Sequence, residues 1–290
     1  MQGAAGAGLT MVGAVLATLA LNAPEGGEAA AARDARIGEA RAGQVTVALP
    51  ETVSDVQMTE ARAPGRPIVL IDPGHGGRDP GATAVSGVTT EKQLTLVMAR
   101  ELRDLLARRG RVRVALTRDS DKYLTLDQRA DLASRLGASL YLSLHMDSAP
   151  NPTARGASVY SLSDVASDVE AARFARVENA ADGSQSQTLD GSVVGMLADL
   201  ALREQMTTSA DLAERLVRKA AGRVLLRPEP HRFAAFHVLG RARVPAVLFE
   251  AGYVSNADDE ISLMSPAGRK PIVAALADAI EADVATRSAR

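Results

Sequence analysis

Three polar residues in this 290-residue chain each follow a short apolar run, at the point where a buried strand would end. His75 lies in the turn DPGHGG after residues 68–72, His145 ends the run LYLSL, and Glu250 follows residues 244–249. In open α/β sheets, ligands bind outside the carboxyl ends of the strands. The sequence therefore predicts that these three side chains meet at one sheet edge, provided that the strands run parallel.

Glu91 adds a carboxylate to this set. It precedes Leu94, Met98 and Leu102 by 3, 7 and 11 residues, a helical spacing that places it on their inward face. The helix dipole favours an acid in the first turn, and an inward-facing carboxylate needs a partner such as a metal ion. Two histidines and one carboxylate form a standard catalytic zinc set, with a fourth position left for water.

Each of these residues also has a simpler interpretation when it is taken alone. His75 could cap a glycine-rich turn, Glu91 could be an exposed helix charge, and Glu250 could pair with an arginine. A phosphate-binding loop is disfavoured, because GHGGRDPG lacks the GKS or GKT ending and the GxGxxG spacing. The convergence of all four residues on one edge favours the metal site.

Alternating strands and helices must position this edge. Apolar runs at residues 68–72, 112–116, 140–144 and 244–249 predict strands, and residues 91–109 predict a helix that is capped by Thr90. A second helix follows the capping box at residues 125–128 and ends near Gly137, and residues 266–285 predict a closing helix. The pattern indicates an α/β fold, with a single mixed, largely parallel sheet flanked by helices.

The composition limits the other possibilities. A hydrophobic fraction of 46% and a charged fraction of 23% suit a globular protein with a core, and a net charge of −2 gives no electrostatic case for nucleic acid. The chain has no cysteine, which excludes disulfides and thiolate metal sites. Any metal ligands must therefore be histidines and carboxylates.

The N-terminal residues indicate export. Residues 4–23 carry no charge, and the apolar run at residues 9–21 fits a signal-peptide core or a marginal membrane anchor. No Lys or Arg precedes that run, which departs from the usual signal pattern, and a buried helix is the alternative. We expect a signal peptide or membrane anchor at residues 1–23, a linker at 24–67, and one catalytic domain at 68–290.

Five stretches point to a known family. They are DPGHGG at residues 72–77, Glu91, SLHMDSAPN at 143–151, RGASVY at 155–160 and FEAGYVSN at 249–256. In order and spacing they resemble the zinc-dependent N-acetylmuramoyl-L-alanine amidases called amidase 3, from residue 68 to about residue 263. The family usually has Glu-Thr where this chain has Glu250-Ala251, so a hydroxyl near the site is lost but the carboxylate remains.

The resemblance implies a set of roles. His75, Glu91 and His145 would bind one Zn²⁺ ion, and Glu250 would be catalytic, taking a proton from water and passing it to the leaving amine. The reaction would be hydrolysis of the amide between N-acetylmuramic acid and L-alanine in peptidoglycan, during cell-wall remodelling and daughter-cell separation. We expect a periplasmic monomer that binds peptidoglycan and no nucleic acid.

Residues 163–208 resemble the helical insertion that covers the active site in the cell-separation members of the family. If residues 163–208 act in the same way, the resting enzyme is slow because its active site is covered. A divisome-linked activator protein would then remove the cover. Glu178 is the candidate autoinhibitory acid that reaches toward the zinc, and an exposed helix charge is the alternative. His231 and His237 have structural or surface roles in our interpretation, although Arg232 in the same stretch could line the substrate groove.

Two other functions stay open at this point. The chain could be a catalytically silent peptidoglycan-binding protein with the same fold, although the presence of His75, Glu91, His145 and Glu250 disfavours this. It could also be a zinc hydrolase that acts on another amide, such as a peptide bond. Only the products of digestion separate that enzyme from an amidase.

Overall fold

The computed structural model describes residues 56–182 and 193–288. They belong to one compact unit, residues 50–290. The expected signal peptide or anchor and most of the expected linker lie outside the described residues. Within the described ranges, no helix is both long enough and apolar enough to cross a membrane.

Within the described residues, seven strands form one mixed sheet with the order β1-β3-β2-β4-β7-β5-β6. The strands are β1 (Met58–Thr59), β2 (Ile68–Pro73), β3 (Arg113–Leu116), β4 (Leu140–Asp147), β5 (Ala157–Leu162), β6 (Leu226–Ala234) and β7 (Ala246–Tyr253). The pairs β3–β2, β2–β4, β4–β7 and β5–β6 are parallel, whereas β1–β3 and β5–β7 are antiparallel. The predicted mixed, largely parallel sheet is confirmed.

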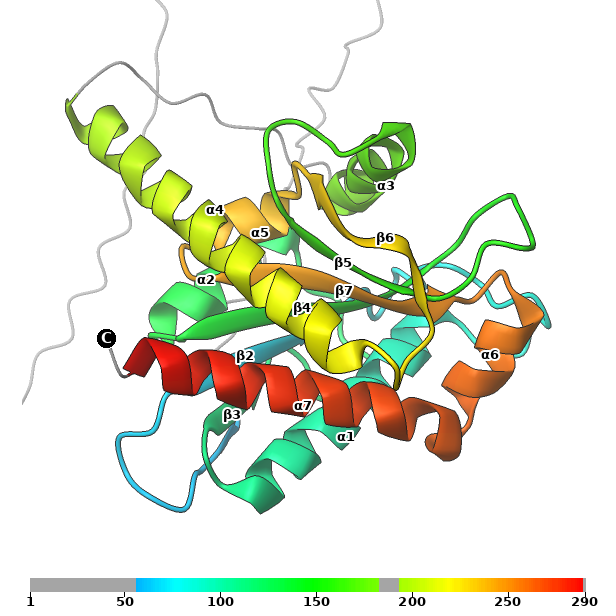
Figure 1. Ribbon diagram of the computed structural model, residues 1–290, viewed down its shortest axis with the longest axis horizontal. Helices are drawn as coiled ribbons and strands as arrows, with labels where there is room; N and C mark the ends of the chain where they lie inside the picture. Colours follow the sequence, from blue (N-terminus) through cyan, green and yellow to red (C-terminus); the bar gives the residue numbers. More distant parts are fainter. Residues whose placement is uncertain (1–55, 183–192, 289–290) are drawn as a thin grey trace, which may run out of the picture. The chain divides into compact units, whose positions relative to one another are not determined.

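Helices cover both faces of the sheet (Figure 1). One core holds apolar side chains of α1 (Glu91–Arg109), α4 (Val193–Ala220) and α7 (Pro266–Ser288). The other holds those of α2 (Leu126–Arg135), α3 (Val169–Asn179) and α5 (His237–Arg241). All residues of β2, β4 and β7 are buried, because a parallel sheet covered on both faces has no polar side, which explains their continuous apolar runs.

The predicted helix boundaries follow from local capping. The Gln93 side chain accepts a hydrogen bond from the Thr90 N–H at 3.0 Å, and Gly110 ends α1 in the left-handed conformation with φ 68°. At the start of α2, Thr125 Oγ1 accepts from the Gln128 N–H at 3.2 Å. Helix α1 spans residues 91–109 as predicted, while α2 ends two residues before Gly137.

Strand β6 was not anticipated. It lies at the edge of the sheet and contains Pro228 and Pro230 among exposed or half-buried residues, so it lacks the apolar pattern of an inner strand. Strand β1 falls within the expected linker and pairs with β3.

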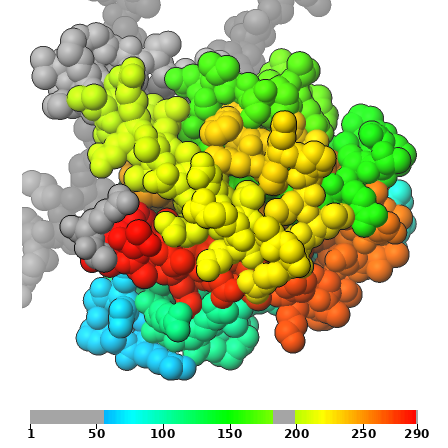
Figure 2. All heavy atoms as spheres, in the orientation of Figure 1, coloured from blue at the N-terminus to red at the C-terminus, as the bar shows by residue number. Residues whose placement is uncertain are grey.

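The expected insertion at residues 163–208 also does not end at a structural boundary. Helix α4 runs through residue 208, and its second half buries Leu212 and Leu216 in the core beside α7. Figure 2 shows α4, in yellow-green and yellow, lying across this face of the molecule above the red α7.

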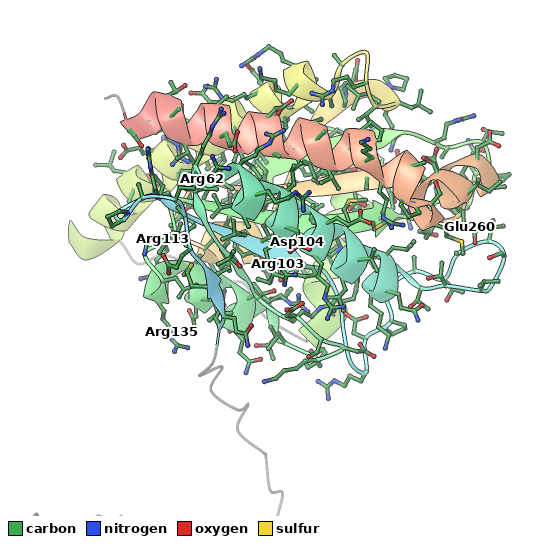
Figure 3. The ribbon with its side chains drawn as sticks, turned by 90° about the horizontal axis from the view of Figure 1, so that it is seen from below. Arg62, Arg103, Asp104, Arg113, Arg135 and Glu260 are labelled. Atoms are coloured by element: carbon green, nitrogen blue, oxygen red, sulfur yellow. The ribbon has the colours of Figure 1, made fainter. Side chains whose placement is uncertain are left out.

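Helix α6 (Ala257–Met264), which follows β7, anchors the loop that precedes α1. The Glu260 carboxylate accepts hydrogen bonds from the Ser86 N–H at 3.1 Å and from the Ser86 hydroxyl. The Val85 N–H donates to Val254 O at 2.9 Å. Figure 3 shows Glu260 at the same end of the molecule as this loop, which leads into Glu91.

Candidate metal centre

The four predicted residues gather at one end of the sheet. His75 lies two residues beyond β2, Glu91 begins α1, and His145 in β4 pairs in register with Glu250 in β7. Because β2, β4 and β7 are parallel neighbours, their carboxyl ends meet at this edge. All four side chains are buried.

The Glu91 carboxylate lies between the two histidines. Its Oε1 is 3.0 Å from His75 Nε2 and 3.0 Å from His145 Nδ1. The same oxygen accepts a hydrogen bond from the Met146 N–H at 3.0 Å, and Oε2 accepts from the Ala82 N–H at 3.0 Å. Backbone donors therefore fix the carboxylate between the two imidazoles, which hold its pKa far below the ordinary value despite burial.

Glycines make this close approach possible. A Cβ on Gly74 would lie 2.4 Å from the His145 ring, and a Cβ on Gly81 would lie 2.6 Å from both Glu91 Oε2 and the His75 ring. His75 itself has φ 60°, a conformation that non-glycine residues rarely adopt and that recurs at functional sites. The DPGHGG turn and the following PGA stretch thus bring the side chains into contact.

A polar shell orients His75. Asp79 Oδ2 lies 2.9 Å from His75 Nδ1, and this carboxylate favours a proton on Nδ1. The opposite nitrogen, Nε2, then points its lone pair at the centre: it lies 3.0 Å from Glu91 Oε1, but without the geometry of a hydrogen bond to any described residue, although it is buried. Arg129 Nη2 donates to the His75 carbonyl at 2.6 Å and holds the turn from below.

Arg129 belongs to a buried network under the turn. Its Nη1 donates to Asp72 Oδ1 at 2.7 Å, and Asp72 also accepts from the hydroxyls of Thr117, Tyr141 and Ser143 at 2.5, 2.7 and 2.9 Å. Burial raises the pKa of Asp72, but Arg129 and the hydroxyl donors outweigh it and lower the pKa to about 2. Asp72 is therefore a carboxylate across the physiological range.

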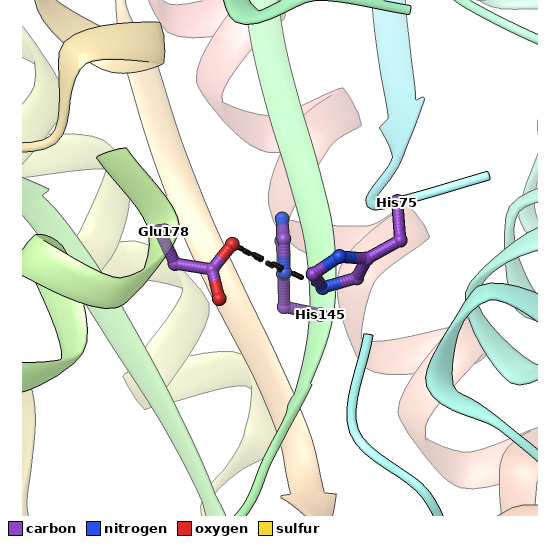
Figure 4. A group of neighbouring side chains, drawn as sticks. All are labelled: His75, His145 and Glu178. Carbon is purple, nitrogen blue, oxygen red and sulfur yellow. Dashed lines mark ion pairs between the residues drawn. The ribbon is translucent and has the colours of Figure 1, made fainter. Parts of the chain in front are cut away.

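Glu178, in the last turn of α3, faces the two histidines from the side of His145 that lies away from His75 (Figure 4). Its Oε2 lies 3.5 Å from His145 Nδ1 and 3.9 Å from His75 Nε2, and the side chain is 12% exposed. Burial raises its pKa, the two histidines lower it, and Glu91 raises it further, with a net upward shift.

These atoms suit a metal ion. Nitrogen atoms of His75 and His145 and a carboxylate oxygen of Glu178 all lie within 4.8 Å of one another, and Glu91 Oε1 lies 3.0 Å from each histidine. Ligands of a tetrahedral zinc ion lie about 3.3 Å apart, since each is about 2.0–2.1 Å from the metal. His75 Nε2, which makes no hydrogen bond with a described residue, and the nitrogen–oxygen donor set fit such an ion.

Glu250 differs from the other carboxylates. It is fully buried, and neither oxygen has a hydrogen-bond partner among the described residues. Burial, followed by the charges of Asp147, Glu91 and Glu178, raises its pKa well above the ordinary value. A carboxyl group with a raised pKa and no hydrogen-bond partner among the described residues suits proton transfer.

A cavity of 360 Å³ adjoins the centre. His75, Glu91, Asp147 and Glu178 contribute to its walls, and α3 forms one side through Phe174 and other residues. The cavity places a substrate-sized volume beside His75 and Glu91, and α3 forms one of its walls.

Sequence reasoning missed the residues that support the site. Asp79 follows His75 by four residues in an aspartate-proline turn, and this proximity was the available signal. Asp147 lies two residues after His145 within the stretch SLHMDSAPN, whereas nothing local marks Arg129, which reaches the site through the fold. His231, by contrast, contacts Ser161 Oγ at 2.9 Å and takes no part in the cluster of His75, His145 and Glu178, as expected.

Comparisons with known proteins agree with this geometry. Residues 69–282 match the family model described as N-acetylmuramoyl-L-alanine amidase. The Escherichia coli K12 protein "N-acetylmuramoyl-L-alanine amidase AmiA" is 34% identical over 220 residues, which cover 74% of this chain and 75% of AmiA. The Haemophilus influenzae probable amidase AmiB is 33% identical over 70% of this chain and 49% of its own length.

Solved structures share the fold. The catalytic domain of CwlV from Bacillus (Paenibacillus) polymyxa var. colistinus aligns with a TM-score of 0.53 at 26% identity, over 74% of this chain and 96% of that one. AmiC2 of Nostoc punctiforme aligns with a TM-score of 0.57 over 78% of this chain and 99% of that one. At 24% identity, the second likeness is one of fold alone.

Proposed function

Because the chain belongs to the N-acetylmuramoyl-L-alanine amidase family, we propose that it hydrolyses the amide between N-acetylmuramic acid and L-alanine in peptidoglycan with one bound zinc ion. The observation that carries this proposal is the Glu91 carboxylate held 3.0 Å from both His75 Nε2 and His145 Nδ1. Two histidines and one carboxylate are the ligand set of a hydrolytic zinc site.

His75, Glu91 and His145 would hold the metal. When bound, zinc polarises a carbonyl and lowers the pKa of water. The protein fixes the ligands beforehand: Asp79 orients the His75 ring, Arg129 holds its carbonyl, and two backbone N–H groups hold Glu91. Other divalent ions can enter such a site, so zinc is a proposal about the native ion.

Glu250 would move the proton. Its carboxylate takes a proton from the attacking water and passes it to the nitrogen of L-alanine as the amide bond breaks. An amine leaves poorly without that proton, so one group must act first as base and then as acid. The free oxygens and the raised pKa of Glu250 support this double role.

Helix α3 would keep the resting enzyme slow. Glu178 lies 3.5 Å from His145 Nδ1. There it would take the fourth ligand position of the metal and exclude water and the substrate carbonyl. An activator protein of the division machinery would draw α3 away during daughter-cell separation. We place the mature monomeric enzyme in the periplasm, where peptidoglycan lies.

A digestion of purified peptidoglycan tests the proposal. Enzyme stripped by a chelator should release no peptide, and one equivalent of zinc should restore release. A peptidoglycan-binding protein without activity would co-sediment with the polymer and release nothing under either condition. A hydrolase of another amide would leave L-alanine attached to muramic acid.

A further inference from the structure

Carboxylates at both ends of α3 contact residues outside the helix. Near its C-terminus, Glu178 faces the two histidines. At its N-terminus, Asp168 Oδ2 lies 2.5 Å from Arg232 Nη2, and Glu170 Oε2 lies 2.9 Å from Arg227 Nη2 and 3.2 Å from Arg232 Nη1. The two arginines belong to β6, so they are part of the sheet and not of the helix.

The arginines form a built cationic site. The Arg232 side chain is only 9% exposed and its guanidinium lies 5.9 Å from the Tyr160 ring centre, while Arg227 is 17% exposed and lies 5.3 Å from the ring of Tyr253. Aromatic faces and burial restrict both guanidinium groups. Their partners on α3 are more open, because the side chains of Asp168 and Glu170 are 40% and 32% exposed.

The cationic site adjoins the reaction cavity. Arg227 Nη1 lies 4.0 Å from Asp147 Oδ2, and Asp147 is part of the cavity wall beside the histidines. Along α3, Phe174 and Val177 line the same cavity between the two ends. Glu178 lies eight positions after Glu170, which corresponds to about 12 Å of helix. Displacement of α3 would thus uncover a strip with the metal ligands at one end and two arginines at the other.

We propose that Arg227 and Arg232 form a carboxylate-binding subsite for the peptide part of the substrate, and that Asp168 and Glu170 occupy this subsite in the resting enzyme. The proposal rests on the function proposed above. A guanidinium group matches a carboxylate in a two-pronged, charge-assisted contact. An extended peptide advances about 3.3 Å per residue, so the carboxylate recognised lies three to four residues beyond the scissile amide.

In this arrangement α3 imitates the substrate at both ends. Glu178 takes the place of the scissile carbonyl, and the pair Asp168 and Glu170 takes the place of the peptide carboxylate. An acidic peptide would then compete with α3 for the arginines, and substrate binding would itself favour the open state.

The test compares two soluble substrates, N-acetylmuramoyl-tetrapeptides whose carboxylates are free or amidated. The full chain is used with zinc and with Glu178→Gln as the common background. Substitutions R227Q and R232Q remove the subsite, whereas D168N and E170Q break the same ion pairs but leave the arginines. This second pair controls for loosening of α3. The R227K/R232K variant keeps the charge and guards against a folding defect.

For the free-carboxylate substrate, R227Q/R232Q should raise KM about 10-fold or more with little change in kcat, and R227K/R232K should restore part of the lost affinity. The amidated substrate should have the same KM with R227Q/R232Q as with the parent enzyme that carries Glu178→Gln alone. D168N/E170Q should lower KM for the free substrate. Calorimetry with the acidic tetrapeptide product and zinc-free protein should give the same order of affinities.

Equal KM values for free and amidated substrates in every variant would overturn the subsite. The same would follow if the arginine variant behaved like D168N/E170Q. Failure of the proposed function has a different signature, because no variant would then release peptide from either substrate.

Discussion

His145 and Glu250 lie opposite each other in register on the neighbouring parallel strands β4 and β7. One is a candidate metal ligand and the other the candidate proton carrier. Their relative position is therefore set by the backbone hydrogen bonds of the sheet centre and not by a mobile loop. Sites built on strands hold reacting groups within a narrow range of positions, which proton transfer between water and a leaving amine requires.

Replacement of the proton carrier should separate chemistry from metal binding. Glu250→Gln should lower kcat by about 10²–10⁴-fold, because general acid–base catalysis contributes a factor of that size. Zinc content, measured by plasma mass spectrometry, should stay near one per chain. Glu204→Gln changes an exposed glutamate of α4 and serves as the matched control. Loss of zinc in Glu250→Gln, or full activity, would contradict the assigned role.

Replacement of a histidine ligand should remove the metal. His145→Ala is expected to lose bound zinc and activity together, since both Glu91 and Glu178 face its Nδ1. His231→Ala is the matched control, because His231 contacts Ser161 and lies outside the cluster. Zinc titration by calorimetry compares the two variants. Unchanged zinc affinity in His145→Ala would show that the ion binds elsewhere.

The hold of α3 should depend on a single carboxylate. Glu178→Gln weakens the contact with the cluster, and the basal rate of peptidoglycan hydrolysis should rise about 10-fold or more, as expected for the loss of roughly 1.4 kcal/mol from the closed state. Release of dye from labelled peptidoglycan measures the rate, with Glu204→Gln again as the control. A lower rate with unchanged zinc content would instead mean that Glu178 contributes to catalysis.

The network under the His75 turn should govern stability at acid pH. The pKa of Asp72 falls from 3.8 to about 2 on folding, so its contribution is present above pH 4 and is lost as the pH falls from about 4 toward 2. The shift corresponds to about 2 kcal/mol. Asp72→Asn leaves Arg129 buried without its counter-charge and should cost about 3–5 kcal/mol near pH 7.

Urea unfolding of zinc-free protein between pH 2.5 and pH 7 measures this contribution. The difference in free energy of unfolding between wild type and Asp72→Asn should shrink as the pH falls below 4. A difference that stays constant across the range would mean that Asp72 has an ordinary pKa in the folded protein.

Whether a feature could be predicted from the sequence depended on how far apart in the chain the interacting residues lie. The start of α1 and the inward position of Glu91 follow from local capping and helical spacing, and both were predicted. The positions of His145 and Glu250 followed from apolar runs that are typical of a parallel sheet covered on both faces. Strand β6 was missed because its edge position leaves Pro228 and half-exposed polar residues without an apolar pattern.

The polar contacts between distant segments were also beyond prediction. The bond from Arg129 to the His75 carbonyl joins residues 54 positions apart, and the pair between Arg232 and Asp168 spans 64. Such contacts leave no local periodicity. In the sequence alone, Glu170 and Arg227 resemble ordinary solvated charges until the fold places them together.

Mass spectrometry of the products from purified peptidoglycan tests the central claim most directly. Wild type, Glu250→Gln and Glu178→Gln would be compared with zinc and with chelator. The account predicts free peptides that begin with L-alanine, formed only with zinc, nearly absent for Glu250→Gln and increased for Glu178→Gln. Fragments that retain muramic acid on the peptide, or no release by a folded, zinc-loaded enzyme, would contradict it.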